Sequence, residues 1–199
     1  MLSIAMFIGF LTLVSCDKQA SNESDAYDYP VKGGTNEWRK LTSHDEMLEV
    51  CQIPDTILKR MSTAGLVETV LNYPLSGDMY AYSNLQQGFD AMTSQFNGLA
   101  ELLNRSDAGT QLLVKYNKSH PLNGDNTEND FEIIRSSFNL GFLEMILSQR
   151  KIILSLSLTQ KEDLLTEATI RYNEKLRQKD LFGRTSGTDT SKALIDACK

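Results

Sequence analysis

The sequence predicts an all-α fold over residues 38–199, with antiparallel helices stacked as a short HEAT-like solenoid or as an irregular helical bundle. Two observations lead to this prediction. Apolar residues recur at helical spacing along most of the stretch, and capping or turn residues divide it into short elements. The longest apolar stripe runs in steps of four and three residues and consists of Leu85, Phe89, Met92, Phe96, Leu99 and Leu103. Such a stripe needs cover from other apolar helices.

Three short helices are expected before this stripe. Ser43 and Glu46 have capping-box spacing, and Pro54 suits the first position of the next helix. Thr63 can cap a third helix, which should end before Tyr73-Pro74 because the residue before proline avoids helical backbone angles. The apolar residues of this region that are expected to cover the stripe are Ile57, Leu58, Met61, Leu66, Val67, Val70 and Leu71.

Ser83 is the expected cap of the striped helix itself. Asn97-Gly98 is typical of a turn, yet the stripe keeps its phase through it, so the sequence leaves a kinked helix and a tight break as open alternatives. Asp107 should then begin a helix that runs through Tyr116.

The carboxyl-terminal third is predicted to form further helices. Phe131 to Met145 has helical apolar spacing, and Thr159 with Glu162 repeats the capping-box spacing before another helix. Residues 154–158 alternate as a strand would, but they lie between helical patterns, which favours a helix or an extended connector. Residues 183–190 form a polar break before a short last helix at Ala193, Leu194 and Ala197.

The amino-terminal segment differs in kind from the domain. Residues 1–13 are almost wholly apolar and too few to span a membrane, which indicates an export signal. Leu13-Val14-Ser15-Cys16 resembles the lipobox of bacterial lipoproteins, although the usual Lys or Arg before the apolar run is missing. The resemblance implies that residues 1–15 are removed and that Cys16 is diacylated. The alternative is a buried amino-terminal helix with an incidental cysteine.

Residues 16–37 are expected to be a flexible polar tether between the membrane and the domain. The segment is rich in Asp, Ser, Asn, Lys and Gly and cannot bury enough apolar surface to order itself. Tyr27, Tyr29 and Pro30 offer the alternative that its end docks on the domain.

Composition excludes some functions. The 199 residues carry a net charge of -6, and the basic residues do not cluster, so nucleic acid is not an expected partner. A hydrophobic content of 41% with 23% charged residues suits a single globular domain.

The sequence contains no recognisable catalytic motif. Both histidines, His44 and His120, lie in polar contexts, and no nucleophile elbow, metal-binding helix pattern, Cys-x-x-Cys pair or phosphate loop is present. Asp125, Thr127 and Asn129 alternate as calcium ligands do, but the turn glycine and the closing carboxylate of an EF-hand loop are missing. We therefore expect no catalytic residue, metal or cofactor. The remaining enzymatic alternative is an envelope hydrolase that uses a carboxylate pair.

Two further groups of residues are candidates for special roles. Cys51 and Cys198 could form a disulfide in an exported protein or stay as two separate buried thiols, and both alternatives are open. Tyr73, Tyr80 and Tyr82 lie near Pro74 and Gly77 and could present a rigid binding surface. Their other interpretation is that they fill the edge of the core.

Cys16 together with the run from Ile53 to Tyr116, including Met61-Ser62-Thr63-Ala64-Gly65 and Phe96-Asn97-Gly98-Leu99, resembles the uncharacterised helical lipoproteins of Bacteroidales-type bacteria. This resemblance implies a lipid-anchored protein of the cell envelope, at the periplasmic or the surface face of the outer membrane, and brings no catalytic residue. The expected function is that of a helical binding module for an envelope protein or glycan.

Overall fold

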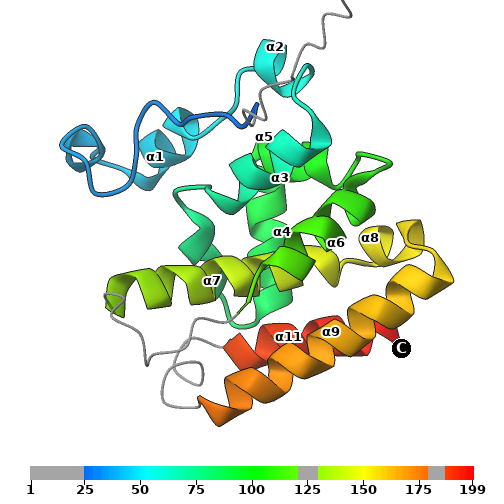
Figure 1. Ribbon diagram of the computed structural model, residues 1–199. Helices are drawn as coiled ribbons and strands as arrows, with labels where there is room; N and C mark the ends of the chain where they lie inside the picture. Colours follow the sequence, from blue (N-terminus) through cyan, green and yellow to red (C-terminus); the bar gives the residue numbers. More distant parts are fainter. Residues whose placement is uncertain (1–24, 121–129, 179–186) are drawn as a thin grey trace, which may run out of the picture.

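The computed structural model describes residues 25–120, 130–178 and 187–199, with the backbone alone for residues 130–134. Within these ranges the chain forms helices and no strand, which confirms the all-α prediction (Figure 1). The elements are η1 (Trp38–Lys40), α1 (His44–Val50), α2 (Asp55–Leu58), α3 (Thr63–Leu71), η2 (Ser76–Ala81), α4 (Leu85–Gln95), α5 (Asn97–Leu102), α6 (Ala108–Lys118), α7 (Asp130–Leu147), α8 (Arg150–Ser155), α9 (Leu158–Arg177) and α11 (Gly187–Cys198).

Helix α7 lies at the centre of the molecule. It contacts α3, α6 and η2, and the carboxyl-terminal helix α11 packs against both α7 and α9 (Figure 1). From residue 140 to residue 147 every position of α7 is buried, so this half of the helix is covered all round. A solenoid would place each repeat only against its neighbours. Helices α7, α9 and α11 are close in chain order, so their contacts are compatible with both predicted arrangements, a short solenoid and an irregular bundle.

The stripe through Asn97-Gly98 is broken rather than kinked. Phe96 is extended between α4 and α5, with φ -120° and ψ 111°. The Asn97 side chain accepts from Ile53 N at 3.0 Å and donates to Ile53 O at 2.7 Å, while Gln52 donates to Gln95 O and accepts from Asn97 N. These long-range bonds replace the helical bonds that the break gives up.

Helix α1 confirms half of its predicted capping box. Ser43 accepts from the backbone N–H of Glu46, as expected. The Glu46 carboxylate, however, accepts its shortest bond from Thr42 N, at 2.6 Å, one residue before the cap.

Three other predicted caps are wrong by one or two residues. Ser62 rather than Thr63 caps α3, because the Thr63 hydroxyl donates to Asp107 instead. Helix α4 is capped by Asn84 instead of Ser83, and α9 by a capping box of Ser157 and Gln160 instead of Thr159 and Glu162. Each site offers several polar residues that can cap, and packing selects among them.

The end of the predicted tether docks on the domain. Tyr29 is 4% exposed and its hydroxyl donates to Thr69 O, while Tyr27 N donates to the Thr69 hydroxyl. Asp25 accepts two bonds from Ser62, at the start of α3. The boundary at residue 38 is therefore wrong, and the docking alternative holds from residue 25 onward. Cys16 and the signal segment lie outside the described residues.

The last predicted helix is longer than expected. It begins at Gly187 and so includes the end of the predicted polar break. The alternating leucines of residues 154–158 belong to α8, an extended connector and the first residue of α9, as the connector alternative required. The calcium-like residues Asp125, Thr127 and Asn129 lie outside the described ranges.

Candidate functional site

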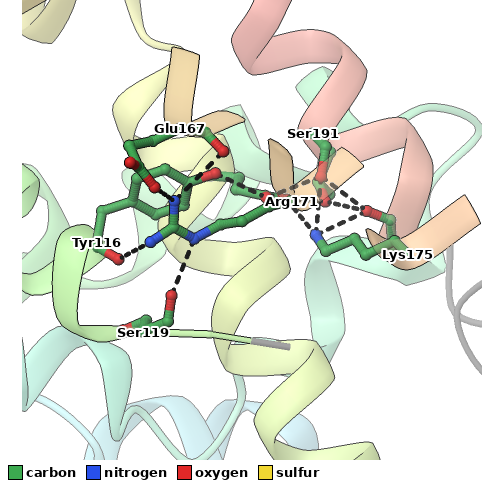
Figure 2. Close-up of polar contacts among 9 residues, drawn as sticks. Tyr116, Ser119, Glu167, Arg171, Lys175 and Ser191 are labelled. Carbon is green, nitrogen blue, oxygen red and sulfur yellow. Dashed lines mark hydrogen bonds and ion pairs between the residues drawn. The ribbon is translucent and has the colours of Figure 1, made fainter. Parts of the chain in front are cut away.

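A buried polar cluster joins α7, α9 and α11 (Figure 2). Glu144 and Lys175 are both fully buried and form an ion pair with Nζ–Oε2 of 2.7 Å. Lys175 also donates to Gly187 O and to the Ser191 hydroxyl, each at 2.9 Å. The same carboxylate accepts from the hydroxyls of Thr190 at 2.6 Å and Ser191 at 2.8 Å.

Every polar atom at the centre of this cluster has a partner. Lys175 uses its three donors, and Glu144 accepts a further bond from the Tyr116 hydroxyl at 3.2 Å. Burial lowers the pKa of Lys175, and the charge of Glu144 opposes that shift. A closed cluster of this kind fixes the position of α11 against α7 and α9, since separating the pair would leave an unpaired buried charge.

Arg171 extends the polar network to the end of α6. Its side chain is 1% exposed and lies over the Tyr116 ring, 4.1 Å from the centroid. The guanidinium donates to Ser119 O at 2.9 Å and to Tyr116 O at 2.8 Å, and it pairs with Glu167 (Figure 2). These carbonyls are among those left without helical partners at a carboxyl terminus, so Arg171 caps α6.

An open pocket of about 560 Å³ lies beside this capped end of α6. Its volume is in the range typical of small-molecule sites. The lining combines charged, amide and hydroxyl side chains with three leucines. The lining comes from α3 (Glu68, Leu71, Asn72), the end of α6 (Lys115, Lys118, Ser119, His120) and α7 (Arg135, Ser136, Asn139, Leu140, Leu143).

Several charged side chains line the pocket. Lys115, Lys118, Arg135 and Glu68 are among its lining residues. Lys115 binds both oxygens of Glu68, at 2.6 and 2.7 Å, which also ties α6 to α3.

The structure does not bring the three candidate tyrosines together as a surface. Tyr73 is 3% exposed and stacks on Phe96 at 3.9 Å, which contradicts its predicted exposure. Tyr80 is partly buried with its ring edge against Phe138, and only Tyr82 is exposed, at 45%. Burial raises the pKa of both Tyr73 and Tyr80. Two of the three therefore follow the core interpretation.

Cys51 and Cys198 are both free thiols in the structure, so they follow the alternative of two separate cysteines. Cys51 is fully buried, and burial raises its pKa to about 11. Cys198 lies partly buried at the end of α11, beside Leu158 and Lys161 of α9.

Sequence reasoning missed Glu144, Arg171 and Lys175. The helical spacing of α9 carries a signal for two of them, because Leu164 and Ala168 are followed in phase by Arg171 and Lys175, and all four are buried. A cation on the apolar face of a helix predicts a buried partner. Glu144 gives the matching signal in α7, within the run Phe142 to Leu147.

Comparison of the chain with protein-family models, with curated proteins and with solved structures gives no match. The described parts of the chain contain no group of three or more His, Cys, Asp or Glu side chains suited to hold a metal ion. In the same ranges no helix is long and apolar enough to cross a bilayer. Fold and site together define an all-α protein with an open, polar-lined pocket beside a closed ionic cluster.

Proposed function

We propose that this chain is a lipid-anchored protein of the cell envelope whose helical domain binds a small ligand in the pocket between α3, α6 and α7. The observation that supports it most directly is the pocket itself, of about 560 Å³ and lined by Lys, Arg, His, Asn and Ser side chains. The lipobox resemblance of Leu13-Val14-Ser15-Cys16 supports the anchor.

The anchor would hold the domain close to the membrane. Asp25 and Tyr27 attach the chain to α3, so only the residues between Cys16 and Asp25 separate lipid from domain. A fully extended chain of that length spans at most about 30 Å. Two acyl chains suffice for stable attachment, at about 0.8 kcal/mol per buried methylene.

The hydrolase alternative has less support. Within the described residues the fully buried carboxylate, Glu144, is paired with Lys175 instead of with a second carboxylate. Its oxygens are all engaged, and the pocket walls supply one carboxylate, Glu68, already bound by Lys115. Neither arrangement supplies the acid and base that a carboxylate pair needs.

Native mass spectrometry tests ligand binding. The full-length protein would be purified in mild detergent from the envelope of its own bacterium, together with two variants. Asn139→Trp fills the pocket, and Asn173→Trp places the same side chain on the exposed face of α9. We expect a bound species with the wild type and with Asn173→Trp that is lost with Asn139→Trp. Equal ligand content in all three, or none in any, would contradict the proposal.

Mass analysis of the mature terminus tests the anchor. We expect a terminus at Cys16 carrying acyl chains, and Cys16→Ala should release the protein from the envelope or leave it unprocessed. An unmodified terminus at another residue would overturn the anchor while leaving the pocket to be judged by its own experiment.

A further inference from the structure

We infer that the α8–α9 corner, residues 154–158, is a membrane contact of the anchored domain, where two exposed leucine side chains enter the lipid surface. This inference rests on the proposed lipid anchor and adds the face that the domain turns towards the membrane. Three observations meet at the corner: exposed leucines, a basic segment without acidic residues, and the attachment point of the chain that leads to Cys16.

The first step is the exposure of the corner. Leu154 and Leu158 are 66% and 73% exposed, more than any other large apolar side chain among the described residues. One lies in the last turn of α8 and the other begins α9, so at most about 14 Å separates their Cα atoms. The corner lies at the edge of the molecule (Figure 1). A single exposed leucine is ordinary, but two on one corner form an apolar patch.

The second step is the charge of the segment. Residues 145–161 contain no Asp or Glu, although the whole chain has a net charge of -6, and their cations are Arg150, Lys151 and Lys161. Arg150 and Lys151 are exposed just before the corner. Lys151 donates to the neutral amide of Asn104 at 2.5 Å, so its charge is not cancelled there. Cations beside exposed apolar residues are typical of segments that bind at an anionic lipid surface.

The third step is the place of the corner relative to the anchor. Asp25, where the described chain begins, binds the start of α3. At the same end the Thr63 hydroxyl donates to Asp107, which precedes α6, at 2.7 Å. Gly109, in the first turn of α6, lies so close to Ser155 of α8 that the space holds no side chain. The corner and the attachment point of the tether therefore share the end of the domain where α3 and α6 begin.

Helix α9 leads away from this end. Gln160, in its first turn, contacts Thr110 at the start of α6, whereas Arg171 binds Ser119 beyond the end of α6. The two helices thus run side by side in the same direction. Ile170 is 46% exposed and lies about 18 Å along the axis from the start of α9. It is a matched control, an exposed apolar residue of the same helix far from the anchored end.

The anchor makes a small contact sufficient. Two leucines alone would bind a membrane weakly, because binding strength scales with the apolar area that is buried. The segment from Cys16 to Asp25 spans at most about 30 Å, so the anchor keeps the corner at a high effective concentration near the lipid surface. The contact then orients a domain that is already attached.

Quenching of tryptophan fluorescence by brominated acyl chains tests this contact. The mature protein is inserted into vesicles of phosphatidylcholine and phosphatidylglycerol that carry bromine on their acyl chains. Three variants are compared: Leu154→Trp, Leu158→Trp and Ile170→Trp. The wild type measures the background from Trp38, the single tryptophan of the chain. We expect the first two variants to be quenched about twofold more, or better, than Ile170→Trp.

A charge at the corner provides the second measurement. Adding Leu154→Asp to Leu158→Trp should lower the quenching about twofold or more, because a carboxylate is excluded from the acyl region. Equal quenching of Leu158→Trp and Ile170→Trp, or no effect of Leu154→Asp, would overturn the inference. Vesicle flotation reports the anchor separately. Protein that floats without this difference refutes the contact and keeps the anchor, whereas protein that does not float refutes the anchor and the inference with it.

Discussion

The Tyr73 hydroxyl is buried and has no hydrogen-bond partner among the described residues, although its ring stacks well on Phe96. An unpaired buried hydroxyl loses its hydration without compensation, at a cost of about 1–3 kcal/mol. Tyr73→Phe should therefore stabilise the protein by about 1 kcal/mol, measured as a higher urea midpoint. Tyr116→Phe is the control, because its hydroxyl donates to Glu144 and its loss should destabilise. A clear loss of stability in Tyr73→Phe would show that the hydroxyl has a partner after all.

Lys175 and Glu144 show the opposite case, a buried pair in which every donor and acceptor is used. Lys175→Met should cost about 3–5 kcal/mol, because it leaves an unpaired carboxylate in the core. Adding Glu144→Gln should recover much of this loss, since no buried charge then remains. Equilibrium unfolding checks both, with Lys192→Met as the control at the exposed pair with Asp196. The explanation fails if the double variant is less stable than Lys175→Met alone.

At the scale of elements, the break between α4 and α5 depends on a segment that lies far away in sequence. The Asn97 side chain accepts from the backbone N–H of Ile53 and donates to its carbonyl. Asn97→Ala leaves both groups unpaired and should cost about 2 kcal/mol in the free energy of unfolding. Asn104→Ala, on an exposed residue that follows α5, should cost much less. Equal costs for the two variants in urea unfolding would show that the contact with Ile53 contributes little.

At the scale of the whole molecule, buried phenols and a thiol make the fold sensitive to alkali. Burial raises the pKa of Tyr29, Tyr73, Tyr80 and Tyr116 above the ordinary 10.0, and that of Cys51 from 9.0 to about 11. A raised pKa in the folded state means that the unfolded chain loses these protons first. The stabilisation is thus complete below pH 9 and is lost progressively above it.

We therefore expect the urea midpoint to stay level between pH 7 and 9 and to fall steadily between pH 9 and 11. Absorbance of tyrosinate should rise together with unfolding, because the buried phenols ionise only when the core opens. A midpoint that does not change up to pH 11 would contradict this expectation.

Sequence alone determined the fold class, most helix positions and the short length of the helices before Tyr73. These features follow from local rules, since the spacing of apolar residues and the nature of capping residues act within a few turns of one helix. Ser43 at the start of α1 and the stripe from Leu85 to Leu103 are examples. The exact cap was less certain where several polar residues were adjacent, as at Ser62 and Thr63.

The tertiary structure decided what depends on contacts between distant segments. Whether Asn97-Gly98 kinks or breaks the stripe was set by Ile53, and the burial of Tyr73 was set by Phe96. The pocket exists because α3, α6 and α7 meet, and no local sequence pattern predicts that these three helices meet. Arg171 and Lys175 lie on the apolar face of α9, so the sequence predicts that they are buried. Only the packing of α6, α7 and α11 supplies their partners. Without those partners, burial of two cations would be strongly unfavourable.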